Sequence, residues 1–204
     1  MTMRQSNPAG HSGPGSEWDA RPALRQMSLA AWFSTFAERH DDLDLVAHEA
    51  CKVAAVGARA RFSVLLQFRA DQQAFMVQAG TGWQGAGVGC VWHTADLTTT
   101  AGLALRTGQL IHFRGLRPGG RVRAVGPMQA RGVQSVLSLP ILGAAREGFG
   151  VLEVGRTETQ EFTRHDASFL QALAHSLAAA VGRHAAVARG HDGHGVLAQR
   201  GAGS

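Results

Sequence analysis

No feature of the sequence constrains its fold more than the spacing of its hydrophobic residues, which changes from a helical period to a strand period and back. Apolar residues recur every three or four positions in 29–40 and 43–56, as on one face of a helix. From 62 to 69 they alternate with polar residues, which is typical of a half-buried strand. The helical spacing returns in 164–188. Because helices and strands are grouped and do not strictly alternate, this order predicts an α+β fold built on an antiparallel sheet.

Turn-forming residues and glycines divide the middle of the chain into further short elements. The predicted strands cover 62–69, 74–79, 109–113, 134–142 and 148–155. The turn at 71–73 joins the first two strands in a hairpin, and Gly143 and Gly148 mark a second hairpin formed by the last two. A short helix is predicted at 98–107, where Gly108 ends it.

The two ends of the chain are rich in glycine and polar residues and show no hydrophobic period. Ser28 is a suitable N-cap for the first helix, so residues 1–27 are predicted to be a flexible tail. Residues 189–204 are predicted to be a second flexible, glycine-rich tail. The domain is therefore expected to span 28–188. Its last helix, at 164–188, is long enough to leave the domain and pair with a second copy.

The whole formal net charge of +5 comes from one segment. It contains Arg114, Arg117, Arg121, Arg123 and Arg131 and no acidic residue, so the rest of the chain is neutral. This arginine-bearing segment, 114–132, is consistent with a solvated loop, an anion-holding lid or a nucleic-acid contact. Nucleic acid is the least favoured of the three, because no aromatic side chains interleave with the arginines as they do in single-strand binders.

Composition disfavours several classes of protein. No apolar stretch reaches the roughly 18 residues needed to span a membrane, and the N-terminus lacks the apolar core of a signal peptide. The chain has two cysteines, Cys51 and Cys90. Two thiols cannot form a disulfide scaffold or a zinc site of four thiolates, and their small number fits a reducing compartment. We therefore expect a cytoplasmic protein that does not contact a membrane.

Motifs for catalysis and cofactor binding are missing or lie in the wrong context. Residues 80–85 match G-x-G-x-x-G, but Gly87 and Gly89 disfavour the helix that a dinucleotide site needs next. The sequence has no Walker loop, nucleophile elbow or H-E-x-x-H motif, and Ser135 has no evident base partner. Cys90 has three possible interpretations: a plain, partly buried cysteine, a reactive thiol or a chromophore attachment point.

Three stretches in the second half of the chain carry a family resemblance. They are GVQSVLSLPI at 132–141, GVLEV at 150–154 and FTRHDASFLQALA at 162–174. With the helix-to-strand run before them, they make the chain from about 41 to 186 resemble a GAF domain, the sensory module of bacterial signalling proteins. The sequence looks most like the GAF domains of bacterial sensor kinases and regulators, and it is expected to stand alone.

The resemblance implies a central antiparallel sheet of five or six strands, with the N- and C-terminal helices packed on one face and a small-molecule pocket on the other. The short helix at 98–107 and the arginine-bearing segment would cover that pocket. The residues that would line it are Phe75 or Val77, Trp83, Trp92, Phe113, Arg131, Ser135 and Leu137, with His93 nearby. Strand alternation alone does not decide whether the odd-numbered or the even-numbered residues of a strand face the pocket. No cofactor is identified.

The sequence departs from the specialised members of this family. It lacks the N-K-x-F-D-E signature of the domains that bind cyclic nucleotides, and it lacks the cysteine–histidine pair that holds bilins. The methionine sulfoxide reductases built on this fold need a set of cysteines, whereas this chain has only Cys90 and, on a predicted helix, Cys51.

These observations favour a non-enzymatic sensory module that binds a small molecule, anionic if the arginines hold it. It would signal through homodimer or partner contacts of the helix at 164–188, with a histidine kinase or another signalling protein as partner. Two alternatives stay open. One is a cysteine-dependent redox enzyme acting through Cys90, and the other is a ligand-free adaptor whose long helices expose apolar residues.

Overall fold

The computed structural model describes residues 15–82, 88–117, 119–124, 126–143 and 147–200. The helices are α1 (Gly15–Arg39), α2 (Leu43–Gly57), α3 (Thr100–Thr107), α4 (Gly126–Ala130) and α5 (Arg164–Arg200). The strands are β1 (Phe62–Arg69), β2 (Ala74–Thr81), β3 (Val91–Thr94), β4 (Ile111–Arg114), β5 (Ser135–Leu142) and β6 (Gly148–Arg156). None of the described helices combines the length and the apolar character that crossing a membrane requires.

The strands form one six-stranded sheet in the order β3-β2-β1-β6-β5-β4, and every neighbouring pair is antiparallel. β1 and β6 lie at its centre, where Val64 pairs with Glu153 and Leu65 with Leu152. The predicted α+β class and antiparallel sheet are therefore confirmed. The short strand β3 was not predicted, because its four residues directly follow a glycine-rich stretch. It forms the sheet edge opposite β4.

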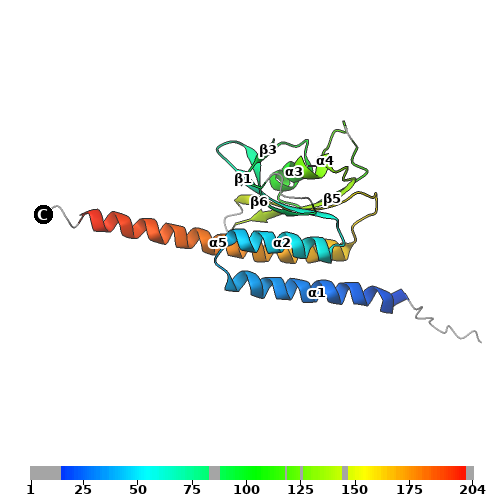
Figure 1. The fold of residues 1–204 in the computed structure, drawn as a ribbon, viewed down its shortest axis with the longest axis horizontal. Coiled ribbons are helices and arrows are strands. Elements are labelled where there is room, and N and C mark those ends of the chain that lie inside the picture. Colours follow the sequence, from blue (N-terminus) through cyan, green and yellow to red (C-terminus); the bar gives the residue numbers. More distant parts are fainter. Residues whose placement is uncertain (1–14, 83–87, 118, 125, 144–146, 201–204) are drawn as a thin grey trace, which may run out of the picture.

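The three long helices cover one face of the sheet, as the resemblance implied. α2 and α5 pack against the strands, and α1 packs against both of them as an outer layer (Figure 1). The core on this side joins Phe33 of α1, Cys51 of α2, Leu65 of β1 and Leu173 of α5, all fully buried. Burying each large apolar side chain contributes about 1.5–3 kcal/mol, which holds the helix layer on the sheet.

The opposite face of the sheet is covered by α3, α4 and the segments around them (Figure 1). A second core lies here, and it includes Val64, Phe75, Val77 and Met128. These side chains are fully buried. This face, where the resemblance implies a ligand pocket, is called the ligand side below, and in the described residues most of it is filled by side chains.

Both terminal helices are longer than predicted. α1 begins at Gly15 and not at Ser28, whose hydroxyl donates to the Leu24 carbonyl within the helix at 3.0 Å and does not cap it. α5 continues to Arg200 and projects beyond the sheet (Figure 1). Glycine lowers helix propensity by about 1 kcal/mol but does not stop propagation from a formed helix. The expected tails are thus helical over 15–27 and 189–200, while 1–14 and 201–204 lie outside the described residues.

Candidate functional site

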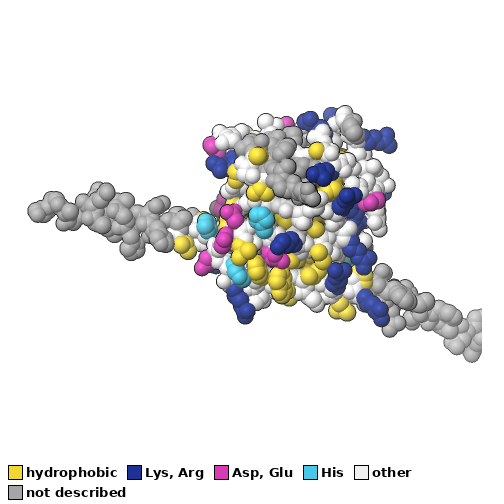
Figure 2. All heavy atoms as spheres, viewed as in Figure 1, with side chains coloured by type: hydrophobic (Ala, Val, Ile, Leu, Met, Phe, Trp, Pro, Cys, Tyr) yellow, Lys and Arg dark blue, Asp and Glu magenta, His cyan; other side chains and the backbone are white. Residues whose placement is uncertain are grey.

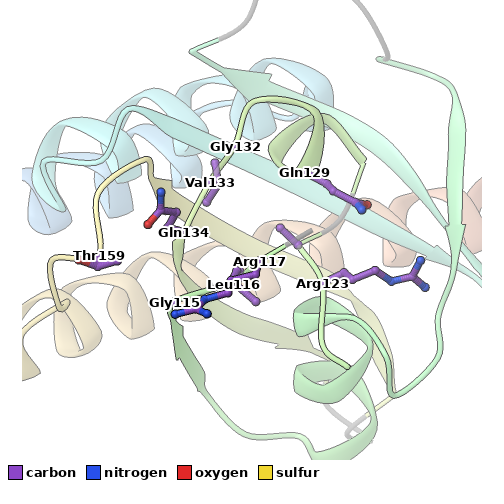
Figure 3. A pocket seen from close by; sticks show the side chains of 10 residues that line it. Gly115, Leu116, Arg117, Arg123, Gln129, Gly132, Val133, Gln134 and Thr159 are labelled. Atoms are coloured by element: carbon purple, nitrogen blue, oxygen red, sulfur yellow. The ribbon is translucent and has the colours of Figure 1, made fainter. Parts of the chain in front are cut away.

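The arginine-bearing segment lies over the end of the sheet where β4 and β5 pair, and it encloses a cavity of about 410 Å³ (Figure 3). The cavity is lined by Gly115, Leu116, Arg117, Arg123, Ala124, Gln129, Gly132, Val133, Gln134 and Thr159. Gly132 has a φ of +67°, a left-handed conformation that suits glycine and turns the chain from α4 towards β5. The segment thus forms a wall of the cavity and not a loop apart from the domain.

Backbone hydrogen bonds hold this wall in place. The Leu116 N–H donates to the Gln134 carbonyl at 2.9 Å, and the Gln134 N–H donates to the Arg156 carbonyl at 2.9 Å. At the other end of the segment, the Thr100 N–H at the start of α3 donates to the Arg123 carbonyl at 3.0 Å. The cavity is therefore anchored to the sheet on one side and to α3 on the other.

The two arginines of the cavity differ in their electrostatic surroundings. Arg123 donates to the Thr98 hydroxyl at 3.1 Å and lies near Asp96, so its charge is partly balanced. A hydrogen bond from Thr98 is the main reason that the pKa of Asp96 lies below its usual value. The side chain of Arg117 has no hydrogen-bond or ion-pair partner among the described residues. With apolar walls such as Leu116 and Val133, the cavity suits an anion that has an apolar part.

The aromatic and aliphatic residues predicted on β2 and β4 do meet on the ligand side of the sheet. Phe75 and Val77 are both fully buried in the core there, and the half-buried Phe113 packs against the same core. None of the three lines the cavity. They fill the ligand side of the sheet and do not reach the open space.

Ser135 lies on the other face of the sheet. Along β5, Val136 belongs to the ligand-side core and Leu137 to the helix-side core. Since side chains alternate, Ser135 and Leu137 point towards the helices, whereas Ser138 points towards the ligand side. Ser135 and Leu137 therefore do not line a pocket on the ligand side, contrary to the expectation from the sequence. The sequence alone did not show which of the alternating residues of β5 face that side.

The remaining predicted residues are not brought together at the cavity. Arg131 is exposed after α4 and does not line the cavity, although it lies in the same segment. Trp92 and His93 belong to β3, at the sheet edge opposite β4, and their side chains lie outside the described residues. Trp83 also lies outside them.

Glu153 is a polar residue of the ligand side that the sequence interpretation missed. Its buried carboxylate accepts a hydrogen bond from the Thr100 hydroxyl at 2.7 Å and another from the Ser138 hydroxyl. Its second oxygen, Oε2, has no partner among the described residues. Burial raises the pKa of this carboxyl group. An acid in the apolar run GVLEV, two positions from Val151 and thus on the same face, was the available signal.

The two cysteines lie in contrasting environments. Cys51 is fully buried in the helix-side core, and this burial raises its pKa to about 12, so it remains a thiol at neutral pH. Cys90 is exposed between β2 and β3. Within the described part of the chain, no group of three or more His, Cys, Asp or Glu side chains is placed to hold a metal ion.

A model of the GAF domain family matches residues 38–182, which is most of the chain, and the protein therefore belongs to the GAF domain family. The comparison with curated proteins gives no match. Solved structures of low sequence identity share the fold, and three of them illustrate its range.

The GAF domain of a phosphoenolpyruvate-protein phosphotransferase from Coxiella burnetii is 16% identical with a TM-score of 0.71, covering 82% of this chain and 98% of that one. The corresponding Acinetobacter domain is 19% identical with a TM-score of 0.69, covering 79% and 95%. Free methionine-R-sulfoxide reductase from Neisseria meningitidis is 14% identical with a TM-score of 0.67, covering 80% and 93%. At these identities the likeness establishes the fold alone.

Proposed function

We propose that this GAF domain is a cytoplasmic sensory or regulatory module, not an enzyme, that binds a small anionic molecule in the cavity beside the arginine-bearing segment. The observation that carries the proposal is Arg117, which has no partner among the described residues and lies on the wall of a cavity of about 410 Å³ with apolar sides. A guanidinium group binds carboxylates and phosphates through paired hydrogen bonds. Leu116 and Val133 would contact the apolar part of such a ligand.

The output of this module would pass through α1 and α5, the outer helix and the helix that leaves the domain. A chain of contacts supports this route: the Gln134 N–H donates to the Arg156 carbonyl, and the Arg156 side chain pairs with Asp166 of α5. Asp166 in turn accepts a hydrogen bond from Gln26 of α1. Exposed apolar side chains of α1, including Leu24, Met27 and Trp32, would take part in the contact. The partner would be a second copy of the chain, or a histidine kinase or another signalling protein, and not a nucleic acid.

Native mass spectrometry of gently purified protein, followed by a variant comparison, tests this function. We expect a non-covalent extra mass that is lost on denaturation and identifies the ligand. Arg117→Ala should weaken its binding by about tenfold or more, because a charge-assisted hydrogen bond is lost. Arg131→Ala removes the same charge from the same segment outside the cavity and should leave binding unchanged. Equal affinity in both variants would remove Arg117 from the proposal.

The redox alternative has less support than it had from sequence. Cys51 is shielded in the core, so only the exposed Cys90 is accessible for thiol chemistry. The adaptor alternative is favoured by the dense packing of Phe75 and Val77 on the ligand side, but it leaves the arginine-lined cavity without a role.

A further inference from the structure

A second cavity, of about 330 Å³, lies at the end of the helix layer where α1 meets the first turn of α5. It is enclosed by α1, the turn between α2 and β1, and the connection from β6 to α5. No residue lines both cavities, although Thr159 lines the first and its neighbour Gln160 the second. Three arginines from three separate parts of the chain, Arg25, Arg59 and Arg156, lie on its wall.

Arg156 is buried in this wall with only 7% of its surface exposed. Its guanidinium group donates to the Glu161 carbonyl at 2.8 Å and to the Ala58 carbonyl at 2.6 Å. Its Nε–H has no partner among the described residues. Both of its acceptors are neutral carbonyl groups, so they orient the cation without neutralising its charge.

The nearest acid, Asp166, is already satisfied by other donors. Its Oδ1 accepts from the Gln26 amide at 2.7 Å, and its Oδ2 accepts from the backbone N–H and the hydroxyl of Thr163 at 2.8 and 3.1 Å. Arg156 lies 3.6 Å from Asp166 Oδ2, beyond hydrogen-bond distance. The carboxylate therefore forms a buried ion pair with the guanidinium group, without a direct hydrogen bond to it, and offsets part of the local charge.

The two outer arginines add charge that no described group balances. Glu161, the other acid on this wall, pairs with Arg114 at 2.7 Å. Neither Arg25 nor Arg59 has a hydrogen-bond or ion-pair partner among the described residues. Arg59 also holds a φ of +49°, which is uncommon for a residue with a side chain. Its positive charge repels that of Arg156, whose pKa is lowered chiefly by burial and least by Arg59, while Asp166 and Glu158 raise it.

We propose that this second cavity is a binding site for a small oxyanion of the phosphate or carboxylate class, held by Arg25, Arg59 and Arg156. Asp166 is paired with Arg156 and Glu161 with Arg114, so an anion there would balance the charges of Arg25 and Arg59 and accept hydrogen bonds from donors that lack partners among the described residues. The same residues connect the helices, since Arg156 contacts the end of α2 and the start of α5 while Gln26 of α1 binds Asp166. The site is thus placed to tighten this end of the helix layer.

Calorimetric titration of inorganic phosphate into the full chain, at constant ionic strength, tests this site. Arg25→Ala and Arg59→Asn should each weaken phosphate binding by about tenfold, because each removes a charged donor. Asparagine tolerates the left-handed backbone at position 59, so Arg59→Asn removes the charge without adding strain. Arg106→Ala, an exposed arginine of α3 outside both cavities, is the control and should bind phosphate as the parent protein does.

Repeating the titrations in an Arg117→Ala background separates this site from the cavity of the proposed function. Phosphate binding that persists there, and is then lost on adding Arg25→Ala, supports the second site. Binding that disappears with Arg117→Ala alone would assign phosphate to the first cavity and overturn this inference while supporting the proposed function. Failure of phosphate to bind the parent protein, or equal binding by all the variants, would also overturn it.

Discussion

The carboxyl group of Glu153 is fully buried on a central strand, where burial raises its pKa above the ordinary value of 4.5. The folded state therefore holds its proton to a higher pH than the unfolded chain does. Between those two pKa values the folded state binds more protons, so the free energy of unfolding falls as pH rises. Glu153 thus contributes most to stability below pH 4.5 and loses that contribution through the window above it.

The substitution Glu153→Gln tests whether Glu153 makes the free energy of unfolding fall as pH rises. The amide keeps an oxygen for the hydroxyls of Thr100 and Ser138 but has no charge to bury. Relative to the parent protein, the variant should therefore gain stability as pH rises from 4 to 7, because only the parent protein has to bury or neutralise a charge there. The gain should vanish near pH 4. Chemical denaturation across this range measures it, and parallel pH profiles for the two proteins would contradict the assignment.

Single residues also show where sequence reasoning reached its limit. Phe75 and Phe113 share the core beneath α3 and α4, whereas Ser135 points to the helix layer, because a shift of one residue moves a side chain to the other face of the sheet. Tertiary packing decides which residues of β5 face the helices, and Leu137 is one of those that contact the helix layer. Arg117 was visible as one of five arginines, yet only the folded segment shows that it lines the cavity and Arg131 does not.

Among the elements, α1 departs most from expectation, and Gln26 is the clearest reason. Its buried amide donates to the Gly57 carbonyl at 3.0 Å and to Asp166 at 2.7 Å, so the early part of the helix is tied to α2 and α5. Composition alone assigned these residues to a tail, because long-range hydrogen bonds leave no periodic signal. The elements with a strong local period, such as β1 and α2, were predicted within a residue or two.

Gln26→Ala should therefore destabilise the whole domain. Removing the amide leaves two buried acceptors with fewer donors, which costs about 1–3 kcal/mol. Gln72→Ala, in the exposed turn between β1 and β2, is the matched control and should change stability by less than about 0.5 kcal/mol. Urea denaturation followed by circular dichroism gives both values. Equal stability of the two variants would show that the part of α1 before residue 28 contributes little to the stability of the domain.

At the scale of the whole molecule, charge and apolar surface are unevenly distributed. Figure 2 shows acidic side chains mainly at the end where α5 leaves the domain, and more of the basic side chains towards the other end. Hydrophobic side chains are visible along the helix layer between them. On α1, Leu24 is 60% exposed and Met27 is 68% exposed, three residues apart and thus on the same face of the helix. Such a surface favours association through the helix layer.

We expect the parent protein to be a homodimer in solution and Met27→Glu to shift it towards monomer. A charge in a small apolar contact costs several times the thermal energy, enough to lower the association constant by about tenfold or more. Leu97→Glu introduces the same charge at an exposed apolar position between β3 and α3, outside the helix layer, and should remain dimeric. Size-exclusion chromatography with light scattering distinguishes the cases. A parent protein that is monomeric at high concentration would contradict the prediction.

The length of α5 has a mechanical consequence. With 37 residues and a rise of 1.5 Å per residue, the helix is about 55 Å long. It is held to the domain as far as Arg183, whose guanidinium group donates to the Ala37 carbonyl of α1 at 2.6 Å. The rest of the helix forms a lever arm about 25 Å long, so a tilt of about 10° at Arg183 would displace the far end by about 4 Å. A rearrangement too small to change the domain itself could therefore bring a distant partner into contact or release it.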